Sequence, residues 1–428
     1  MTIVLAGNLN EKDTSQYVNA ATFSLMLFNL TTTAIGFGLA SALDTLCSQA
    51  YGAKRYDKIG VYFQTGCLVL SANLILVGTA TWYAEDILKW LGQDEEVARL
   101  SADFSRCLFP GIPFLCLYEL TRKVLQSQNI IAPLVVIVVI GNVVNISAGY
   151  GLAYHTSLGF NGIAIGTSIG NMSLAILLVP YFMWRPHHLN QWWVHPWNLK
   201  AATRYLGAFL RLGIPGMLMD MMEMWGMETL SILSGLLPNG VEAVAAHSVL
   251  VNVNMLVDTT FYGFSVAANI RVGNYLGAGA FNHAKLARTV ALQITFVISC
   301  TFAVLLFSFS GVIPRLILGG SESAALASKV MAIWAPLTVV DGLNTVCQGV
   351  CRGAGKQKSA AISNAVAYYA AGIPFGAYLA FQCHLGVEGL WFGTGLGDIL
   401  AVTALMLLMK YRWNWEKLAD DATKQANN

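Results

Sequence analysis

The segment Pro215 to Glu228, PGMLMDMMEMWGME, places three carboxylates inside a long apolar stretch of the chain. These are Asp220, Glu223 and Glu228. An ionised side chain at the centre of a bilayer helix costs about 2.5–3.5 kcal/mol on insertion scales, so three of them in one helix indicate a function. Because a helix turns by about 100° per residue, Asp220 and Glu223 lie on one face of it, and Glu228 lies on another.

A close pair of carboxylates in a medium of low dielectric does not readily hold two negative charges, so one of the pair should bind a proton. Such a pair is suited to the proton-binding site of a carrier. The methionines around the acids have soft, flexible side chains, which suit a pocket that accepts varied apolar shapes. The alternative is a structural network, in which the acids pair with bases elsewhere in the fold.

The composition indicates a protein that crosses the lipid bilayer many times. The 428 residues are 56% hydrophobic and only 11% charged, against about 25% charged in a soluble domain. A net charge of +2 without a basic run gives no indication of nucleic-acid binding. The eight cysteines form no CxxC pair and the histidines show no ligand spacing, so we expect no metal site. We find no motif of a nucleotide-binding or hydrolytic enzyme and expect no cofactor.

Eleven windows are long and apolar enough to form membrane-spanning helices of about 20 residues. They are 18–46, 59–84, 100–125, 130–155, 160–184, 203–236, 241–268, 286–313, 325–350, 359–382 and 386–411. The opening MTIVLAG is too short to span and is typical of the end of a helix. We therefore expect an all-α membrane protein of twelve helices, in which the first helix is truncated and about eleven spans are complete.

Positive charges predict the orientation. If successive loops alternate between the two sides, most of the 25 Lys and Arg residues fall on one side, together with the C-terminus. The positive-inside rule places that side in the cytoplasm. The polar loop 186–200 is predicted to be a cytoplasmic linker between two lobes, at 1–185 and 201–415. The tail, 416–428, is polar and is expected to be disordered in the cytoplasm.

The two halves of the chain repeat one another. LGFNGIAIGTSIGN at 158–171 aligns without a gap with LGVEGLWFGTGLGD at 385–398, and both Gly166 and Gly393 belong to stripes of glycine at four-residue spacing. A weaker match joins 38–53 to 263–278. Stripes of glycine let helices approach closely. A parallel repeat of this kind gives two pseudo-symmetric lobes that face one another, and the substrate sites of secondary carriers lie in the cleft at the midline between such lobes.

The motifs ASALDTLCSQAYGA (40–53), GFSVAANIRVGNYLGAG (263–279) and RGAGKQK (352–358) resemble the eukaryotic branch of the multidrug and toxic compound extrusion (MATE) transporters. The resemblance covers nearly the whole chain. It implies two six-helix lobes and the cation-coupled export of small organic molecules. It also implies that the chain begins within the family's first helix.

The resemblance also suggests functional positions. Glu223 matches the glutamate that the family uses for proton coupling, and Asp341 and Glu228 match further family acids. Trp225 stands where plant-like members often have an aromatic residue, and Asn252 stands where animal members often carry an acid. We expect Glu223, Asp341 and Glu228 to couple protons.

Further polar residues are expected to contact substrate. These are Asp220, Trp225, Asn252, Asn344 and Gln348. Asp44 is expected near a helix end or a contact between lobes, and Glu119 is expected to form a local ion pair with Arg122 and Lys123. Asp258 and Asp398 are buried acids that could line the interior of the second lobe.

We therefore predict a monomeric antiporter that exchanges protons for small organic cations, xenobiotics or secondary metabolites across a plasma or vacuolar-type membrane. Protonation of Glu223, helped by Asp341, would weaken the hold on a cationic solute. Sodium coupling is the lesser alternative. A flippase for lipid-linked oligosaccharides and a non-transporting fragment are the other two, and the acidic rather than basic buried charges argue against the flippase.

Overall fold

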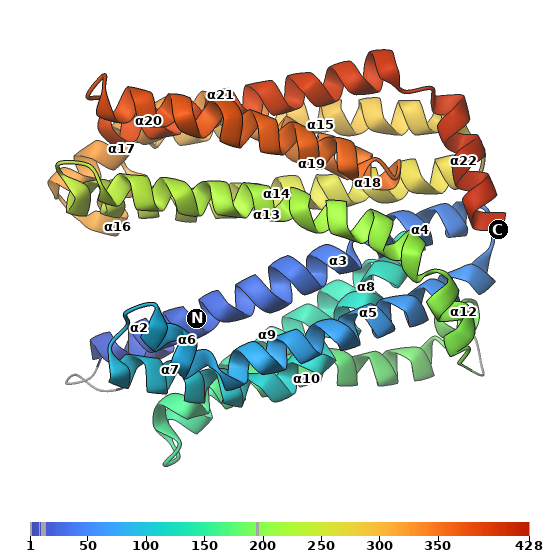
Figure 1. The fold of residues 1–428 in the computed structure, drawn as a ribbon, viewed down its shortest axis with the longest axis horizontal. Coiled ribbons are helices and arrows are strands. Elements are labelled where there is room, and N and C mark those ends of the chain that lie inside the picture. Colours follow the sequence, from blue (N-terminus) through green and yellow to red (C-terminus); the bar gives the residue numbers. More distant parts are fainter. Residues whose placement is uncertain (1, 8, 10–13, 194–196, 428) are drawn as a thin grey trace. The chain divides into compact units, whose positions relative to one another are not determined.

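The structure, a computed structural model, describes residues 2–7, 9, 14–193 and 197–427. The part of the chain that it describes is built from helices without strands (Figure 1). This agrees with the all-α membrane protein predicted from composition. In lipid, backbone N–H and C=O groups have no water to bond to, so the protein must satisfy all of them itself. A helix does this within a single segment.

The first half of the chain contains α1 to α12 together with η1, a π-helical segment, and η2, a 3₁₀ turn. Their bounds are α1 Thr2–Gly7, α2 Thr14–Phe28, η1 Asn29–Phe37, α3 Gly38–Ala40, α4 Ala42–Gly52, α5 Tyr56–Trp82, α6 Ala84–Trp90, α7 Glu95–Leu108, η2 Phe109–Gly111, α8 Ile112–Ser127, α9 Ala132–Tyr154, α10 Gly159–Trp184, α11 His187–Asn190 and α12 Leu199–Arg204.

The second half contains α13 to α22, with the 3₁₀ turn η3 and the π-helical segments η4 and η5. Their bounds are α13 Leu206–Gly235, α14 Gly240–Gly277, α15 Phe281–Ser308, α16 Ile313–Leu318, α17 Glu322–Trp334, η3 Ala335–Leu337, α18 Thr338–Gly353, α19 Gln357–Ala365, η4 Val366–Gly372, α20 Ile373–Phe381, α21 Gly386–Leu407, η5 Leu408–Arg412 and α22 Trp415–Asn427.

The chain folds into two compact units. The N-terminal unit comprises Met1–Cys47 and Arg55–Met217, and the C-terminal unit comprises Ser48–Lys54 and Leu218–Asn428. The division therefore falls inside α13, shortly after Pro215, which interrupts the helical hydrogen-bond ladder because it lacks an N–H group. The lobe boundaries predicted from the 186–200 loop remain a prediction.

Nine helical stretches of the described residues are long and apolar enough to cross a membrane. They are Thr14–Gly52, Tyr56–Trp82, Glu95–Ser127, Ala132–Tyr154, Gly159–Trp184, Gly240–Gly277, Phe281–Ser308, Glu322–Gly353 and Gly386–Arg412. The remaining two predicted windows, 203–236 and 359–382, are also helical, as α13 and as the run α19–η4–α20. Both are less apolar, since α13 carries three acids and an arginine and α19 is polar.

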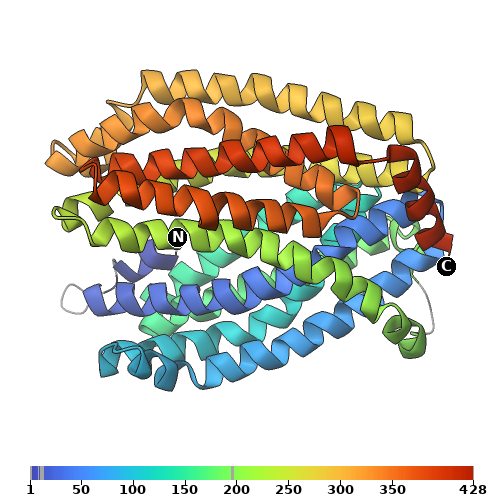
Figure 2. The same cartoon turned by 45° about the horizontal axis from the view of Figure 1, so that its top comes forward.

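The sequence repeat corresponds to a repeated helix contact. In the N-terminal unit, a Cβ added to Gly166 on α10 would lie 2.3 Å from the Cα of Gly149 on α9. In the C-terminal unit, a Cβ added to Gly393 on α21 would lie 2.5 Å from the Cα of Gly376 on α20. Gly376 and Gly393 each lie 227 residues after their counterparts Gly149 and Gly166, which is the offset of the sequence repeat. Each helix pair runs side by side in both views (Figures 1 and 2).

Alanine at Gly166 or Gly393 is expected to destabilise the protein. The added methyl group would meet backbone atoms that cannot move without separating the helices, and overpacking of this kind costs about 1–3 kcal/mol. Gly151→Ala on α9 is the matched control, because a Cβ there meets nothing within 4 Å. Thermal unfolding in detergent should show a lower midpoint for the first two variants and an unchanged or higher midpoint for the control, since alanine favours helices. Equal midpoints for all three would contradict this account of the glycine stripes.

The prediction of a disordered tail is wrong. Trp415–Asn427 forms α22, which packs against α14 and α15 of the C-terminal unit. Trp415, Leu418, Ala419 and Ala422 recur at helical spacing and are buried, while the polar residues occupy the other face. The polar composition of the tail was a misleading guide, because an amphipathic helix is stabilised mainly by burying its apolar face and can be polar overall.

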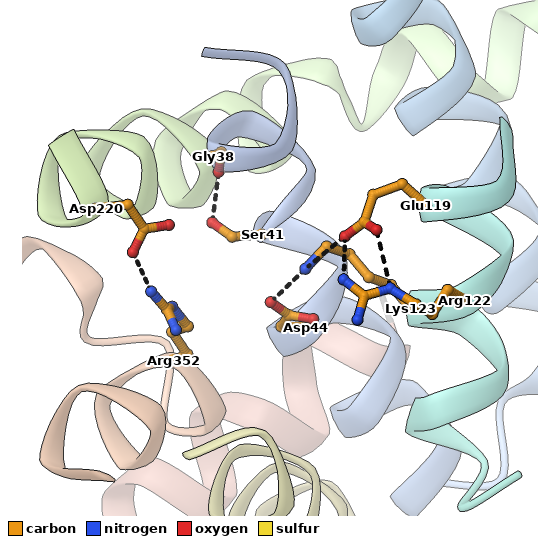
Figure 3. A network of polar contacts seen from close by, with 8 residues as sticks. All are labelled: Gly38, Ser41, Asp44, Glu119, Arg122, Lys123, Asp220 and Arg352. Carbon is orange, nitrogen blue, oxygen red and sulfur yellow. Dashed lines mark hydrogen bonds and ion pairs between the residues drawn. The ribbon is translucent and has the colours of Figure 1, made fainter. Parts of the chain in front are cut away.

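Four charged side chains form a network inside the N-terminal unit, in which Glu119 and Lys123 are buried and Asp44 and Arg122 are partly exposed (Figure 3). Lys123 on α8 is only 5% exposed and lies between two acids, with its Nζ 2.8 Å from Asp44 Oδ2 and 3.7 Å from Glu119 Oε1. Arg122 pairs with Glu119 as well, at 2.6 Å. The predicted ion pair of Glu119 is therefore confirmed, and Asp44 joins α4 to α8 through Lys123.

Candidate functional site

A cavity of about 490 Å³ lies within the C-terminal unit. It is lined by α13, α14, α17, α18, α20 and α21 and by the π-helical segment η4. Among the described residues, its lining includes five carboxylates and a single cation, the guanidinium of Arg352. The five acids are Asp220, Glu223, Asp258, Asp341 and Asp398. A cavity with this balance of charges attracts cations and repels anions.

Glu223 and Asp341 face the same cavity from two helices. Glu223 lies on α13, and its Oε2 accepts a hydrogen bond from Gln348 Nε2 at 3.3 Å. Asp341 lies on α18, is 8% exposed, and lines the same cavity. Asp341 and Gln348 are seven residues apart on α18, two helical turns, which places both on one face. Asp341 therefore joins Glu223 and Asp220 in lining the cavity, and it does so from a helix far from them in sequence.

Asp220 has a different environment. It lies one turn before Glu223 on α13 and forms an ion pair with Arg352 near the end of α18 (Figure 3). Arg352 is 7% exposed, whereas the side chain of Asp220 is 42% exposed. This pairing stabilises the negative charge of Asp220 and makes it a weaker candidate than Glu223 for binding a proton.

Asp398 is held by a chain of hydrogen bonds. The hydroxyl of Tyr368, in η4, donates to Asp398 Oδ1 on α21. Tyr368 in turn accepts a hydrogen bond from Asn344 Nδ2 on α18, at 3.1 Å. Asn344 is 1% exposed and stands behind Tyr368, so it positions that side chain rather than lining the cavity. π-Helical segments such as η4 often occur at functional sites, because the extra residue redirects side chains.

Apolar and aromatic side chains complete the lining. Met224, Met227 and Met255 face the cavity, and Trp334, Trp391, Tyr262 and Tyr368 supply ring surfaces. Aromatic faces attract organic cations through their negative quadrupole. Methionine side chains adapt to differently shaped apolar groups. The lining can therefore hold a small molecule that combines a positive charge with apolar bulk.

The structure brings some of the predicted residues into this cavity and leaves others outside it. Glu223, Asp341, Asp220 and Gln348 line it. Glu228, Trp225 and Asn252 are exposed and lie outside its lining. Asn252 uses its amide to donate to the carbonyl of Ser248, one turn earlier on α14. Among the described residues no cluster of three or more His, Cys, Asp or Glu could hold a metal ion.

Two residues of the site were not anticipated, namely Arg352 and Tyr368. Arg352 begins the RGAGKQK motif just beyond the predicted window 325–350, and its spacing of four residues from Gln348 continues the polar face of α18. That spacing was the signal that could have found it. Tyr368 stands in an ordinary apolar run, and nothing in its sequence context distinguishes it.

Comparisons with known proteins agree over nearly the whole chain. The sequence model of the MatE family matches residues 2–151 and 215–378. Multidrug and toxin extrusion protein 1 of Mus musculus is 35% identical over 424 residues, which are 99% of this chain and 73% of that protein. Multidrug and toxin extrusion protein 2 of Mus musculus is 34% identical over 410 residues, 96% of this chain and 70% of that protein.

Solved structures show the same relationship. The crystal structure of the eukaryotic MATE transporter AtDTX14 superimposes with a TM-score of 0.89 at 30% identity, covering 99% of this chain and 93% of that one. A MATE structure in the bent conformation, 16% identical, shares the fold with a TM-score of 0.84. With a family match over most of its length and relatives above 30% identity, the chain belongs to the MatE family of membrane transporters.

Proposed function

We propose that this protein is an antiporter that extrudes small organic cations and xenobiotics in exchange for protons, with Glu223 as the coupling carboxylate. The observation that carries the proposal is the placement of Glu223. Its carboxylate faces a largely apolar cavity that Asp341 also lines, and it accepts a hydrogen bond from the neutral amide of Gln348. A carboxylate in that position can gain and lose a proton without breaking an ion pair.

Exchange follows from competition at this site. With Glu223 ionised, the acidic and aromatic lining binds a cationic solute. Protonation removes a charge from the cavity and weakens that binding, so proton entry from the outer or lumenal side drives release there. A tenfold difference in affinity between the two states corresponds to about 1.4 kcal/mol. The names of the relatives, multidrug and toxin extrusion proteins, support the direction of transport.

Acids dominate the cavity, and this argues against the lipid-linked oligosaccharide flippase. A site for a phosphate-linked substrate needs several cationic donors. Here the lining offers one guanidinium, and Asp220 already pairs with it. A cationic substrate is the better match for this balance of charge.

The proposal is tested with the purified protein in liposomes and a fluorescent organic cation. Uptake should follow an imposed pH gradient, should stop when nigericin collapses that gradient, and should not follow a sodium gradient of the same size. Protein-free liposomes give the background. Uptake driven by sodium alone, or uptake that ignores both gradients, would contradict proton antiport.

A further inference from the structure

A groove with a cation at one end runs along α15 on the surface of the C-terminal unit. It has a volume of about 370 Å³ and is lined by residues of α15, α18 and α21. Its apolar lining consists of Leu292, Phe296, Val297, Leu343 and Met406. Only 17% of the most apolar part of α15 is buried, the smallest share among the candidate spans of the described residues. The groove therefore opens toward the lipid that surrounds this helix.

Arg288 stands at the end of the groove without an acid to neutralise it. Its Nη2 donates to Thr289 Oγ1 at 3.3 Å, and its guanidinium carbon lies 5.7 Å from the centroid of the Trp415 ring. Its Nε is buried without an acceptor, and no acid forms an ion pair with it, among the residues that the structure describes. Because a buried donor without an acceptor is costly, this end of the groove suits an anionic group from outside the protein.

A basic cavity adjoins the groove at this end. It has a volume of about 400 Å³, and its lining from α15, η5 and α22 includes Lys285, Arg412 and Trp415. Because Trp415 lies against Arg288, the cavity and the groove meet at this pair. Lys285 lies three residues before Arg288 on α15 and therefore on the same side of the helix. In the described part of the chain, Glu416 is the one acid of these two linings against three cations, so the region attracts anions.

The dimensions of the groove match one leaflet of a bilayer. Arg288 and Val297 are nine residues apart on α15, which corresponds to about 14 Å along the helix axis. The hydrocarbon core of a bilayer is about 30 Å thick, so one leaflet supplies about half of that length. Arg288 lies near the beginning of the candidate span Phe281–Ser308, and Trp413 and Trp415 stack on each other beside it. Tryptophan is enriched at this level, the membrane–water interface.

We propose that the groove and the basic cavity together bind one anionic phospholipid, from the leaflet next to the N-terminal end of α15. The phosphate lies at Arg288 and Lys285, and one acyl chain follows the groove past Phe296 to Val297. Gln293, between them, can donate to an ester carbonyl of the lipid. Guanidinium groups match phosphate oxygens, and basic pockets between transmembrane helices bind anionic headgroups. None of these residues lines the acidic cavity, so the inference is independent of proton antiport.

Other occupants fit this surface less well. The choline group of a zwitterionic lipid would bring a fourth positive charge to the three cations of the protein. A free phosphate ion would satisfy Arg288 but would leave the apolar lining of the groove uncovered. An anionic phospholipid matches both the charge at one end and the apolar surface along the rest.

Native mass spectrometry of the full chain in a mild detergent tests this binding. The probes are dioleoylphosphatidylglycerol, dioleoylphosphatidylcholine with the same chains, and glycerol 1-phosphate, which carries the anion without chains. The wild-type protein should bind the phosphatidylglycerol about tenfold more tightly than the phosphatidylcholine, a difference of about 1.4 kcal/mol. A large excess of glycerol 1-phosphate should not displace the lipid.

Arg288→Gln should weaken binding of phosphatidylglycerol about tenfold and remove the preference over phosphatidylcholine. The amide keeps part of the side chain but carries no charge for the phosphate. Arg315→Gln is the matched control, because Arg315 is an exposed residue of α16 and lines neither the groove nor the basic cavity. Its affinity for both lipids should equal that of the wild type.

A second pair of variants tests the acyl-chain part of the groove. Val297→Trp places a bulky ring in the groove without changing any charge, so it should weaken binding of phosphatidylglycerol several-fold. Val304→Trp is its control, because Val304 lies seven residues later on the same face of α15, outside the groove, and is 65% exposed against 64% for Val297. It should bind the lipid as the wild type does.

Four results would overturn the proposal. The first is equal wild-type affinity for the two lipids, and the second is displacement of the lipid by glycerol 1-phosphate, which indicates a plain anion site. The third is unchanged lipid binding by Arg288→Gln or by Val297→Trp. The fourth is a wild-type dimer in detergent that Val297→Trp converts to a monomer, which identifies the groove as an interface between two copies of the chain. The wild-type comparisons decide the matter even if a variant does not fold.

Discussion

Glu223→Gln should reduce uptake driven by a pH gradient at least tenfold. The amide keeps the size of the side chain and its contact with Gln348, but it carries no charge and binds no proton. Removal of one member of a desolvated charge pair costs about 2–5 kcal/mol, and 1.4 kcal/mol corresponds to a factor of ten. Both the binding of a cationic substrate and its release on protonation depend on the carboxylate, so the initial rate in proteoliposomes should fall accordingly.

Glu322→Gln is the matched control for this experiment. Glu322 lies in the first turn of α17, is exposed, and does not line the cavity. Its variant should transport at the wild-type rate. If Glu223→Gln also transports at the wild-type rate down the same proton gradient, Glu223 is not the coupling carboxylate.

The second large effect concerns stability rather than transport. Lys123→Met should destabilise the N-terminal unit, because it leaves Asp44 and Glu119 largely buried with one cation fewer between them. Removing one partner from a buried ion pair costs about 3–5 kcal/mol. Arg122 still pairs with Glu119, so Asp44 bears most of the loss. Thermal unfolding followed by size exclusion in detergent should show a clearly lower midpoint.

Lys89→Met removes a lysine that is also paired with two acids, Glu85 at 3.0 Å and Glu95 at 2.8 Å. These pairs lie at the surface, where an ion pair contributes about 0–1 kcal/mol. The midpoint for this control should therefore change little. If the unfolding midpoints of Lys123→Met and Lys89→Met fell equally, the Lys123 network would stabilise the protein no more than a surface ion pair does.

Much of the fold followed from regularities that repeat along the chain. Hydropathy identified the helices, and the offset of 227 between Gly166 and Gly393 identified the repeat. The glycine contact confirms that the equivalence is structural, since Gly149 and Gly376 occupy matching positions opposite them. Spacing along a helix also placed Glu223, and the family resemblance added Asp341. These signals are local or periodic, which is why one sequence suffices to detect them.

Contacts between distant helices were not accessible in the same way. Spacing grouped Asp220 with Glu223, but the structure pairs Asp220 with Arg352, which lies 132 residues away. Glu228 and Trp225 were expected at the site from the family resemblance, although periodicity already placed Glu228 on another face of the helix, and both are exposed. The helical tail was missed because its buried face consists largely of alanine, which gives a weak hydrophobic signal. In each case, packing between helices far apart in the sequence determined which side chains are paired or buried.

The most direct test of proton coupling records the pH inside liposomes while substrate enters. The liposomes contain the wild-type protein and a trapped pH indicator, with no pH gradient at the start. An inward gradient of an organic cation should raise the internal pH, because protons leave as substrate enters, and Glu223→Gln should largely abolish that rise. Entry of substrate through the wild-type protein at constant internal pH would contradict the account.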